Sequence, residues 1–177
     1  MATFPSYAAR QFGSGDFLKV LLCGLLLLPV QGALAATIGR PGYGPEWMIV
    51  LTVYVALRSE LWVTVLAALA LGAGRDTLSG FMTGLWPLTL IMLAWLFHPS
   101  RSRLDFFHPL ALIPLIFMLT LGSYILIMTP VMAILGWPGN QYNPVPFFLI
   151  SSLATALTAP PVFALLNLMT VAKDPGR

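Results

Sequence analysis

The sequence predicts an all-α integral membrane protein with six transmembrane helices. Of its 177 residues, 58% are hydrophobic and only 8% are charged, whereas soluble domains carry about 25% charged residues. Six apolar runs follow one another along the chain, and about 20 residues per crossing leave room for six spans. Nine basic and six acidic side chains cannot hydrate the surface of a chain of this size. A soluble enzyme, a nucleic-acid-binding protein and a disordered chain are therefore excluded.

A polar segment and a long apolar run open the chain. Residues 1–16 contain glycine, proline and charged side chains and are expected to form a short N-terminal arm. The run 17–38 is long enough to cross a bilayer, and Pro29 is expected to bend it. The segment 39–46 is rich in glycine and proline, which predicts a loop after the first span.

The first run has a second interpretation. Residues 20–36 resemble the apolar part of a secretory signal peptide, and Ala33-Leu34-Ala35 fits a cleavage pattern. Asp16 and the lack of a dense basic cluster before the run favour a retained first span. Cleavage would leave five spans without changing the orientation of the others.

Five further apolar runs complete a single membrane domain over residues 17–172. The second and third, 47–57 and 61–74, measure about 16 and 21 Å as helices, at roughly 1.5 Å per residue, against a hydrocarbon core of about 30 Å. The remaining runs cover 81–97, 109–135 and 146–171, the last interrupted by Pro160 and Pro161, and residues 173–177 are expected to form a short cytoplasmic tail.

The two short runs allow three arrangements. They could recruit flanking residues such as Pro45, Arg58 and Asp76 into the membrane as two separate spans. They could form a re-entrant hairpin that enters and leaves on one side. They could also join into one span over 47–74, with Arg58 and Glu60 near its middle.

The distribution of basic residues favours six spans with both termini in the cytoplasm. Cytoplasmic loops carry an excess of Lys and Arg, and five spans divide the nine basic residues less unevenly in either orientation. With six spans, only Arg40 and Arg75 lie outside, whereas the cytoplasmic side receives Arg10, Lys19, Arg58, Arg101, Arg103, Lys173 and Arg177.

Small residues recur four positions apart around the end of the third run. The pairs are Ala68 with Gly72, Ala70 with Gly74, and Gly80 with Gly84. This spacing lets helix backbones approach closely in lipid. The pattern predicts either packing within the chain or a docking face for another membrane helix.

Two charges follow this small-residue run. An ionisable group well inside a bilayer costs at least about 2.5–3.5 kcal/mol, so Arg75 and Asp76 are expected to lie at the membrane interface. Asp76 precedes Thr77 and is a candidate N-cap of the fourth helix, with a contact to a partner protein as the alternative. Arg58 and Glu60 are interpreted as loop charges at the cytoplasmic face.

Catalytic, metal-binding and cofactor-binding patterns are not found. Cys23 has no partner cysteine, and His98 and His108 have no acidic or cysteine cluster beside them. No glycine-rich phosphate loop is present. Nearly every charge falls in a predicted loop or at a helix end, which favours a non-enzymatic protein that holds others together. The expected polar groups within the spans are serines, threonines, Gln31, Tyr54, Tyr124 and Asn167.

The middle of the chain resembles the rod shape-determining protein MreD family. Pro45 and Trp47 begin a short helix that contains Tyr54, and the glycine-rich helix that follows runs into Asp76. The resemblance then continues through Leu78, Gly80, Gly84 and Leu85. It implies a non-enzymatic inner-membrane subunit of the bacterial cell-elongation machinery. Its implied partners, besides membrane lipids, are the bitopic periplasmic scaffold MreC, the elongation transpeptidase and glycosyltransferase, and indirectly MreB filaments.

The family is also similar in architecture to the vitamin-binding subunits of energy-coupling-factor transporters, which have six helices with short second and third spans. The alternative function is therefore a substrate-binding subunit of a small-molecule transporter. Pro160 and Pro161 support it, because broken helices can line a substrate cavity. Such a subunit would need a pocket, expected on the outer side near residues 136–146.

Overall fold

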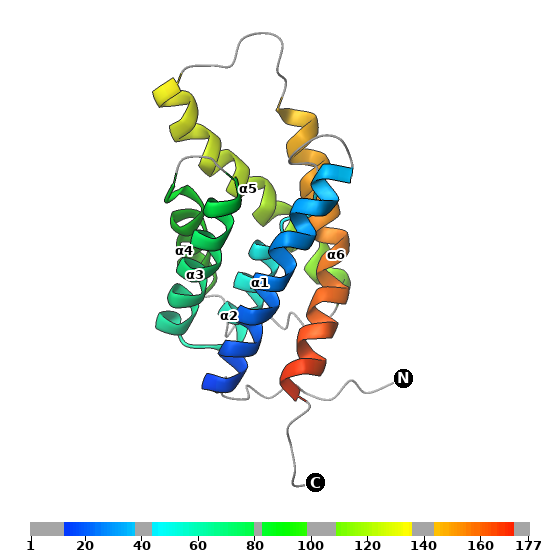
Figure 1. The fold of residues 1–177 in the computed structure, drawn as a ribbon. Helices are drawn as coiled ribbons and strands as arrows, with labels where there is room; N and C mark the ends of the chain where they lie inside the picture. Colours follow the sequence, from blue (N-terminus) through cyan, green and yellow to red (C-terminus); the bar gives the residue numbers. More distant parts are fainter. Residues whose placement is uncertain (1–12, 38–43, 80–82, 99–108, 136–143, 172–177) are drawn as a thin grey trace, which may run out of the picture.

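The computed structural model describes residues 13–37, 44–79, 83–98, 109–135 and 144–171. These residues form six α-helices and no strand (Figure 1). The helices are α1 (Ser14–Thr37), α2 (Trp47–Arg58), α3 (Leu61–Ser79), α4 (Leu85–Phe97), α5 (Pro109–Leu135) and α6 (Val145–Val171).

Within the described ranges, the expectation of an all-α fold with six helices is confirmed, and α5 begins and ends where its apolar run does. The expected end of the third helix at residue 74 is wrong, because α3 continues to Ser79 and contains Arg75 and Asp76. The expected interruption at Pro160 and Pro161 is also wrong, since α6 runs through both prolines. Proline fixes φ near the helical value, so the pair removes backbone hydrogen bonds without ending the helix.

The shortest helix lies at the centre of the bundle. α2 contacts all five other helices. Around it the others form a closed ring in the order α1, α3, α4, α5, α6, and α6 contacts α1 again. A single span over 47–74 is excluded, because α2 and α3 are separate helices that pack against each other on either side of Ser59 and Glu60.

The composition of α2 explains its position. Residues 47–56 are apolar apart from Thr52 and Tyr54, and all ten are buried. A helix that is apolar on every face belongs in the interior. Thr52 donates its hydroxyl to the carbonyl of Met48, so it exposes no unsatisfied donor. The turn into α3 is held by Ser59, whose Oγ donates to the carbonyl of Val55 at 2.8 Å.

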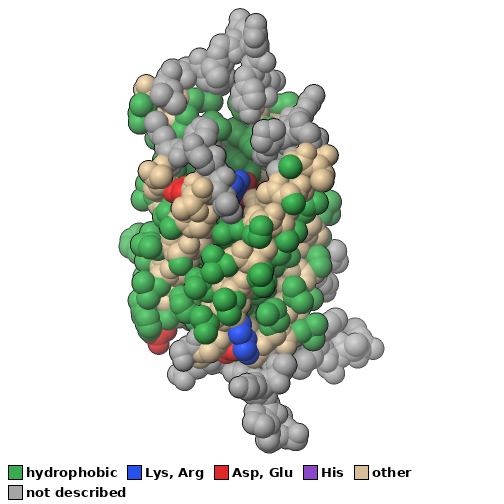
Figure 2. Space-filling model, viewed as in Figure 1, with side chains coloured by type: hydrophobic (Ala, Val, Ile, Leu, Met, Phe, Trp, Pro, Cys, Tyr) green, Lys and Arg blue, Asp and Glu red, His purple; other side chains and the backbone are tan. Residues whose placement is uncertain are grey.

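The outer helices present apolar side chains to their surroundings. Figure 2 shows hydrophobic side chains over the visible face, with acidic and basic ones only toward its two ends. By length and composition, three helices can cross a membrane, with apolar stretches at Gly15–Leu34, Ala111–Ile134 and Val145–Thr170. The described part of the chain is therefore a lipid-facing bundle with three long helices and three shorter ones.

Candidate functional site

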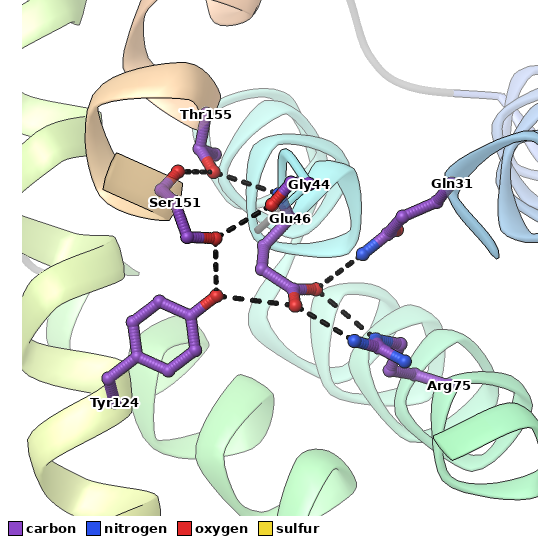
Figure 3. A network of polar contacts seen from close by, with 7 residues as sticks. All are labelled: Gln31, Gly44, Glu46, Arg75, Tyr124, Ser151 and Thr155. Carbon is purple, nitrogen blue, oxygen red and sulfur yellow. Dashed lines mark hydrogen bonds and ion pairs between the residues drawn. The ribbon is translucent and has the colours of Figure 1, made fainter. Parts of the chain in front are cut away.

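A buried ion pair lies at the N-terminal end of α2. Glu46, the residue before the helix, is 1% exposed. Its Oε1 accepts from Nη2 of Arg75 at 2.8 Å, and its Oε2 accepts from Nε of Arg75 at 3.2 Å (Figure 3). Oε2 also accepts from Nε2 of Gln31 at 2.7 Å. The carboxylate thus receives a two-pronged arginine contact from α3 and an amide from α1.

The opposite side of Glu46 meets hydroxyl groups from α5 and α6. The hydroxyl of Tyr124 lies 2.6 Å from Oγ of Ser151 and 3.3 Å from Oε1 of Glu46. Ser151 donates to the carbonyl of Gly44 at 2.7 Å. The backbone N–H of Glu46 donates to Oγ1 of Thr155 at 2.8 Å. As Figure 3 shows, one carboxylate and its adjoining backbone join side chains from four surrounding helices.

The network lies well inside the bundle. Gln31 stands six residues before the end of α1, and Ser151 stands six residues after the start of α6. At about 1.5 Å per residue, each lies about 9 Å from its helix end. A lone charge at this depth would be costly. Glu46 and Arg75 offset each other's charge, and the guanidinium of Arg75 also lies 5.1 Å from the ring centre of Trp86.

Hydrogen bonding saturates the carboxylate of Glu46. A carboxylate offers about four lone-pair sites, and three nitrogen donors and the Tyr124 hydroxyl surround this one. A general base or a metal ligand needs a free lone pair directed at its target. Among the described residues, no group of three or more His, Cys, Asp or Glu side chains is placed to hold a metal ion. The arrangement is suited to fastening helices together.

A second polar cluster fixes the other end of α2 to α6. The hydroxyl of Tyr54 lies 2.9 Å from Oγ1 of Thr170 and donates to Oδ1 of Asn167 at 3.2 Å. Nη2 of Arg58 donates to the same Oδ1 at 2.7 Å, and its guanidinium lies 4.7 Å from the ring centre of Tyr54. Phe163 packs edge-on against Tyr54, with ring centres 5.3 Å apart. Arg58 therefore contacts a neighbouring helix as well as ending α2.

Two of the glycines singled out in the sequence, Gly72 and Gly74, pack against other helices of the same chain. A Cβ added at Gly72 would lie 2.5 Å from the backbone of Pro87 in α4. One added at Gly74 would lie 2.9 Å from the side chain of Leu28 in α1. Gly84 has φ of +99° and immediately precedes α4. Gly80 lies outside the described residues.

Asp76, which lies within α3, accepts hydrogen bonds from backbone N–H groups at the start of α4. Its carboxylate accepts from the backbone N–H of Gly84 at 2.5 Å and from that of Trp86 at 3.4 Å. The sequence placed it as the N-cap residue itself, which is wrong, since Gly84 occupies that position. The chemistry is the expected one, because free N–H groups at a helix start favour a negative acceptor.

The remaining candidates also face inward. Pro45 is buried, as is Trp47, whose Nε1 donates to Oγ1 of Thr158 at 3.2 Å. Seven of the nine predicted site residues thus surround the ends of α2 or the α3–α4 contact: Pro45, Trp47, Tyr54, Gly72, Arg75, Asp76 and Gly84. Gly74 packs against α1.

Glu46 is the central residue that the sequence analysis missed. It was assigned to a loop. Because charges in loops and at helix ends were interpreted as surface charges, Glu46 was not recognised as a buried residue. A signal was present: a helix of 12 residues measures about 18 Å, so residues beside its ends lie below the surface of a core of about 30 Å. A charge beside such an end requires an opposite charge at the same depth, and Arg75 provides it.

Comparison with known proteins agrees with the resemblance in the sequence. The family model described as rod shape-determining protein MreD matches residues 16–169. No curated protein and no solved structure matches the chain, so the expected similarity to energy-coupling-factor transporter subunits gains no support there. The family match covers most of the chain, including all but the ends of the six-helix bundle, and the chain therefore belongs to the MreD family of rod shape-determining proteins.

Proposed function

We propose that this chain is a non-enzymatic inner-membrane subunit of the bacterial cell-elongation complex. Membership of the MreD family makes it a rod shape-determining membrane protein of the MreBCD shape system. The proposal adds its partners: the periplasmic scaffold MreC, the elongation transpeptidase and glycosyltransferase, and MreB filaments indirectly. In this role the membrane helices hold the partners together during peptidoglycan synthesis.

The saturation of Glu46 is the observation that carries the non-enzymatic role. The buried carboxylate and guanidinium are committed to each other and to neighbouring helices. Of the hydroxyls near the proline pair, those of Ser151, Thr155 and Thr158 each donate to a backbone carbonyl, whereas the buried Oγ of Ser152 has no hydrogen-bond partner among the described residues. No observation favours the transport alternative over the scaffold role.

The proposed topology has six spans, with both termini cytoplasmic. Two contacts support it. Nζ of Lys19, near the start of α1, donates to the carbonyl of Met169 near the end of α6 at 2.9 Å. Arg58, at the end of α2, contacts Asn167 in α6. An arrangement of six alternating helices requires these three ends on one side, and the basic side chains there suit the cytoplasmic face.

Affinity purification from mild detergent tests the partner assignment. An epitope-tagged chain, expressed at its native level in the bacterium that encodes it, is expected to recover MreC and the two synthases. Depletion of the chain is expected to turn rods into spheres. A tagged unrelated membrane protein of similar size is the control. Recovery of the chain alone, with rod shape maintained on depletion, would contradict the proposal.

A further inference from the structure

We propose that the end of the bundle at the start of α2 binds the headgroup of a membrane phospholipid. The lipid phosphate accepts hydrogen bonds from Arg75, and a hydroxyl or amine of the headgroup donates to Gln31. In the proposed topology this end of the bundle meets the outer leaflet. The inference goes beyond the proposed function, because it does not depend on any protein partner.

The guanidinium of Arg75 has donors that Glu46 does not use. A guanidinium carries five N–H groups, and Glu46 accepts from Nε and from Nη2. No described residue provides an acceptor for Nη1. The side chain of Arg75 is 19% exposed, whereas that of Glu46 is 2% exposed. The ion pair is therefore closed on the carboxylate side and accessible on the guanidinium side.

Gln31 leaves an acceptor unpaired beside the same carboxylate. Its Nε2 and the Nε of Arg75 both donate to Oε2 of Glu46, so the amide and the guanidinium are neighbours around one oxygen. Gln31 is 5% exposed, and its Oε1 has no hydrogen-bond partner among the described residues. Buried polar groups in proteins are nearly always hydrogen-bonded. A ligand that carries both an acceptor and a donor completes this network.

The helices around α2 extend past the network and leave a recess above it. α2 begins at Trp47, whereas α5 continues for eleven residues beyond Tyr124 and α1 for six beyond Gln31, or about 16 and 9 Å. No described helix occupies the centre of the ring beyond the start of α2. Figure 2 shows basic and acidic atoms set back in a hollow at this end. The basic ones belong to Arg75, because the other described basic side chains lie at the opposite end of the bundle.

Apolar surfaces for acyl chains lie on the helices that rise above the network. Tyr124 packs against Phe147 and Phe148 where α5 and α6 touch. Figure 1 shows α5 tilted across the bundle, so that its upper end diverges from the upper end of α6. The exposed apolar side chains on these upper parts are Leu126, Ile134, Val145, Leu149 and Ile150. A phospholipid with its headgroup in the recess can therefore rest its acyl chains against protein.

The charge of the site favours a phospholipid over a free anion. Arg75 and Glu46 together carry no net charge, so they exert little long-range attraction on an anion in solution. A phospholipid is already held at the membrane surface by its acyl chains, so binding removes less translational freedom. A phosphodiester also accepts two parallel N–H bonds from one guanidinium. The headgroup of phosphatidylethanolamine adds an amine donor, which phosphatidylcholine lacks.

Native mass spectrometry of the full chain in mild detergent micelles tests the proposal. The wild type is titrated with phosphatidylethanolamine, phosphatidylcholine and diacylglycerol that carry identical 18-carbon acyl chains. Phosphatidylethanolamine is expected to bind about tenfold more tightly than diacylglycerol, which lacks the phosphate, and phosphatidylcholine is expected to fall between them. Equal binding of phosphatidylethanolamine and diacylglycerol would overturn the proposal. Equal binding of the two phospholipids would refute the contact with Gln31.

Two further arms locate the site and identify the source of the phosphate. The double variant Glu46→Gln with Arg75→Met is expected to lose the preference for the phospholipid, whereas Lys19→Met, which removes a part-exposed basic side chain at the opposite end, is expected to keep it. Circular dichroism checks that both variants are folded. A preference that survives in the double variant would contradict the assignment to Arg75. Displacement of the lipid by inorganic phosphate at equal concentration would assign the site to a free anion instead.

The lipid titration and the affinity purification fail independently. A phospholipid preference in the wild type, with no recovery of MreC or the synthases, would refute the proposed function alone. Recovery of these partners by a chain that binds phospholipid and diacylglycerol equally would refute the lipid site alone.

Discussion

Replacing Glu46 by glutamine is expected to destabilise the bundle strongly. The substitution keeps the size of the side chain and exchanges one carboxylate oxygen for an NH₂ group. Whichever oxygen is replaced, the new donor faces at least one N–H of Arg75, because Arg75 donates to both oxygens. Removing one member of a buried ion pair costs about 3–5 kcal/mol, because the other charge is left uncompensated.

The magnitude is tested by a double-mutant cycle with Arg75→Met. Each single variant leaves one member of the Glu46–Arg75 pair charged without the other, and the double variant removes both of these charges. The double variant is therefore expected to be more stable than the sum of the two single losses indicates, with a coupling energy of about 1–3 kcal/mol. Equilibrium unfolding in mixed detergent micelles, followed by circular dichroism of the helices, gives the free energies of unfolding of the wild type, the two single variants and the double variant.

Glu60→Gln is the matched control. It is the same substitution at an exposed glutamate whose Oε2 accepts from Nε1 of Trp62 at 2.6 Å. Its cost is expected to stay within about 0.5 kcal/mol, as for surface substitutions in general. A loss below about 1 kcal/mol for Glu46→Gln, or additive losses in the cycle, would refute the account of the network as a fastening between helices.

Three further substitutions follow from the packing, each measured by the same unfolding assay. Gly72→Ala places a Cβ 2.5 Å from backbone atoms of α4 and is expected to lower the free energy of unfolding by about 1–3 kcal/mol. Gly32→Ala, which has open space around it, is the control and is expected to be neutral or stabilising. Equal effects of the two substitutions would contradict the close contact at Gly72. Gly84→Ala is expected to lower the free energy of unfolding by about 1–2 kcal/mol, because an alanine is strained at the positive φ of this residue although no atom lies close to the added Cβ. Gly122→Ala is the control for the added methyl group, since Gly122 is equally uncrowded and has no positive φ. Tyr54→Phe removes the hydroxyl that joins α2 to α6 and is expected to cost about 1–3 kcal/mol by leaving buried polar partners unsatisfied; an unchanged free energy of unfolding would show that the second polar cluster does not stabilise the bundle.

Hydropathy predicted the ends of a helix correctly where the sequence changes from apolar to polar at those ends. It gave the wrong end where the helix continues past such a change. α5 is apolar throughout its length and is bounded by loops, so its limits could be taken from composition. α3 continues for five residues beyond the expected limit at residue 74. Backbone hydrogen bonding, not hydropathy, decides where a helix ends, and the polar groups of Arg75 and Asp76 find partners on neighbouring helices.

The site was harder to predict than the fold for a related reason. Arg75 and Asp76 stood out because they interrupt a small-residue run, but their partners are 29 and 8 or more residues away in sequence. Glu46 lies in a segment whose glycines and prolines indicate a loop. A loop assignment does not show how deeply a residue is buried in the bundle. Only the placement of α2 at the centre of a ring brings its first residues below the surface of the bundle.

The central position of α2 constrains how the protein is made. During synthesis α2 is among the first helices to leave the ribosome, yet the groups that satisfy the backbone at its start, Ser151 and Thr155, belong to the last helix. Until α6 is inserted, the N–H of Glu46 and the carbonyl of Gly44 lack these partners in an environment that offers few substitutes. The early helices therefore cannot complete their packing until the end of the chain has been synthesised. Assembly of the bundle is completed late, and a chain that stops before α6 is expected to be recognised by cellular proteases as unfinished.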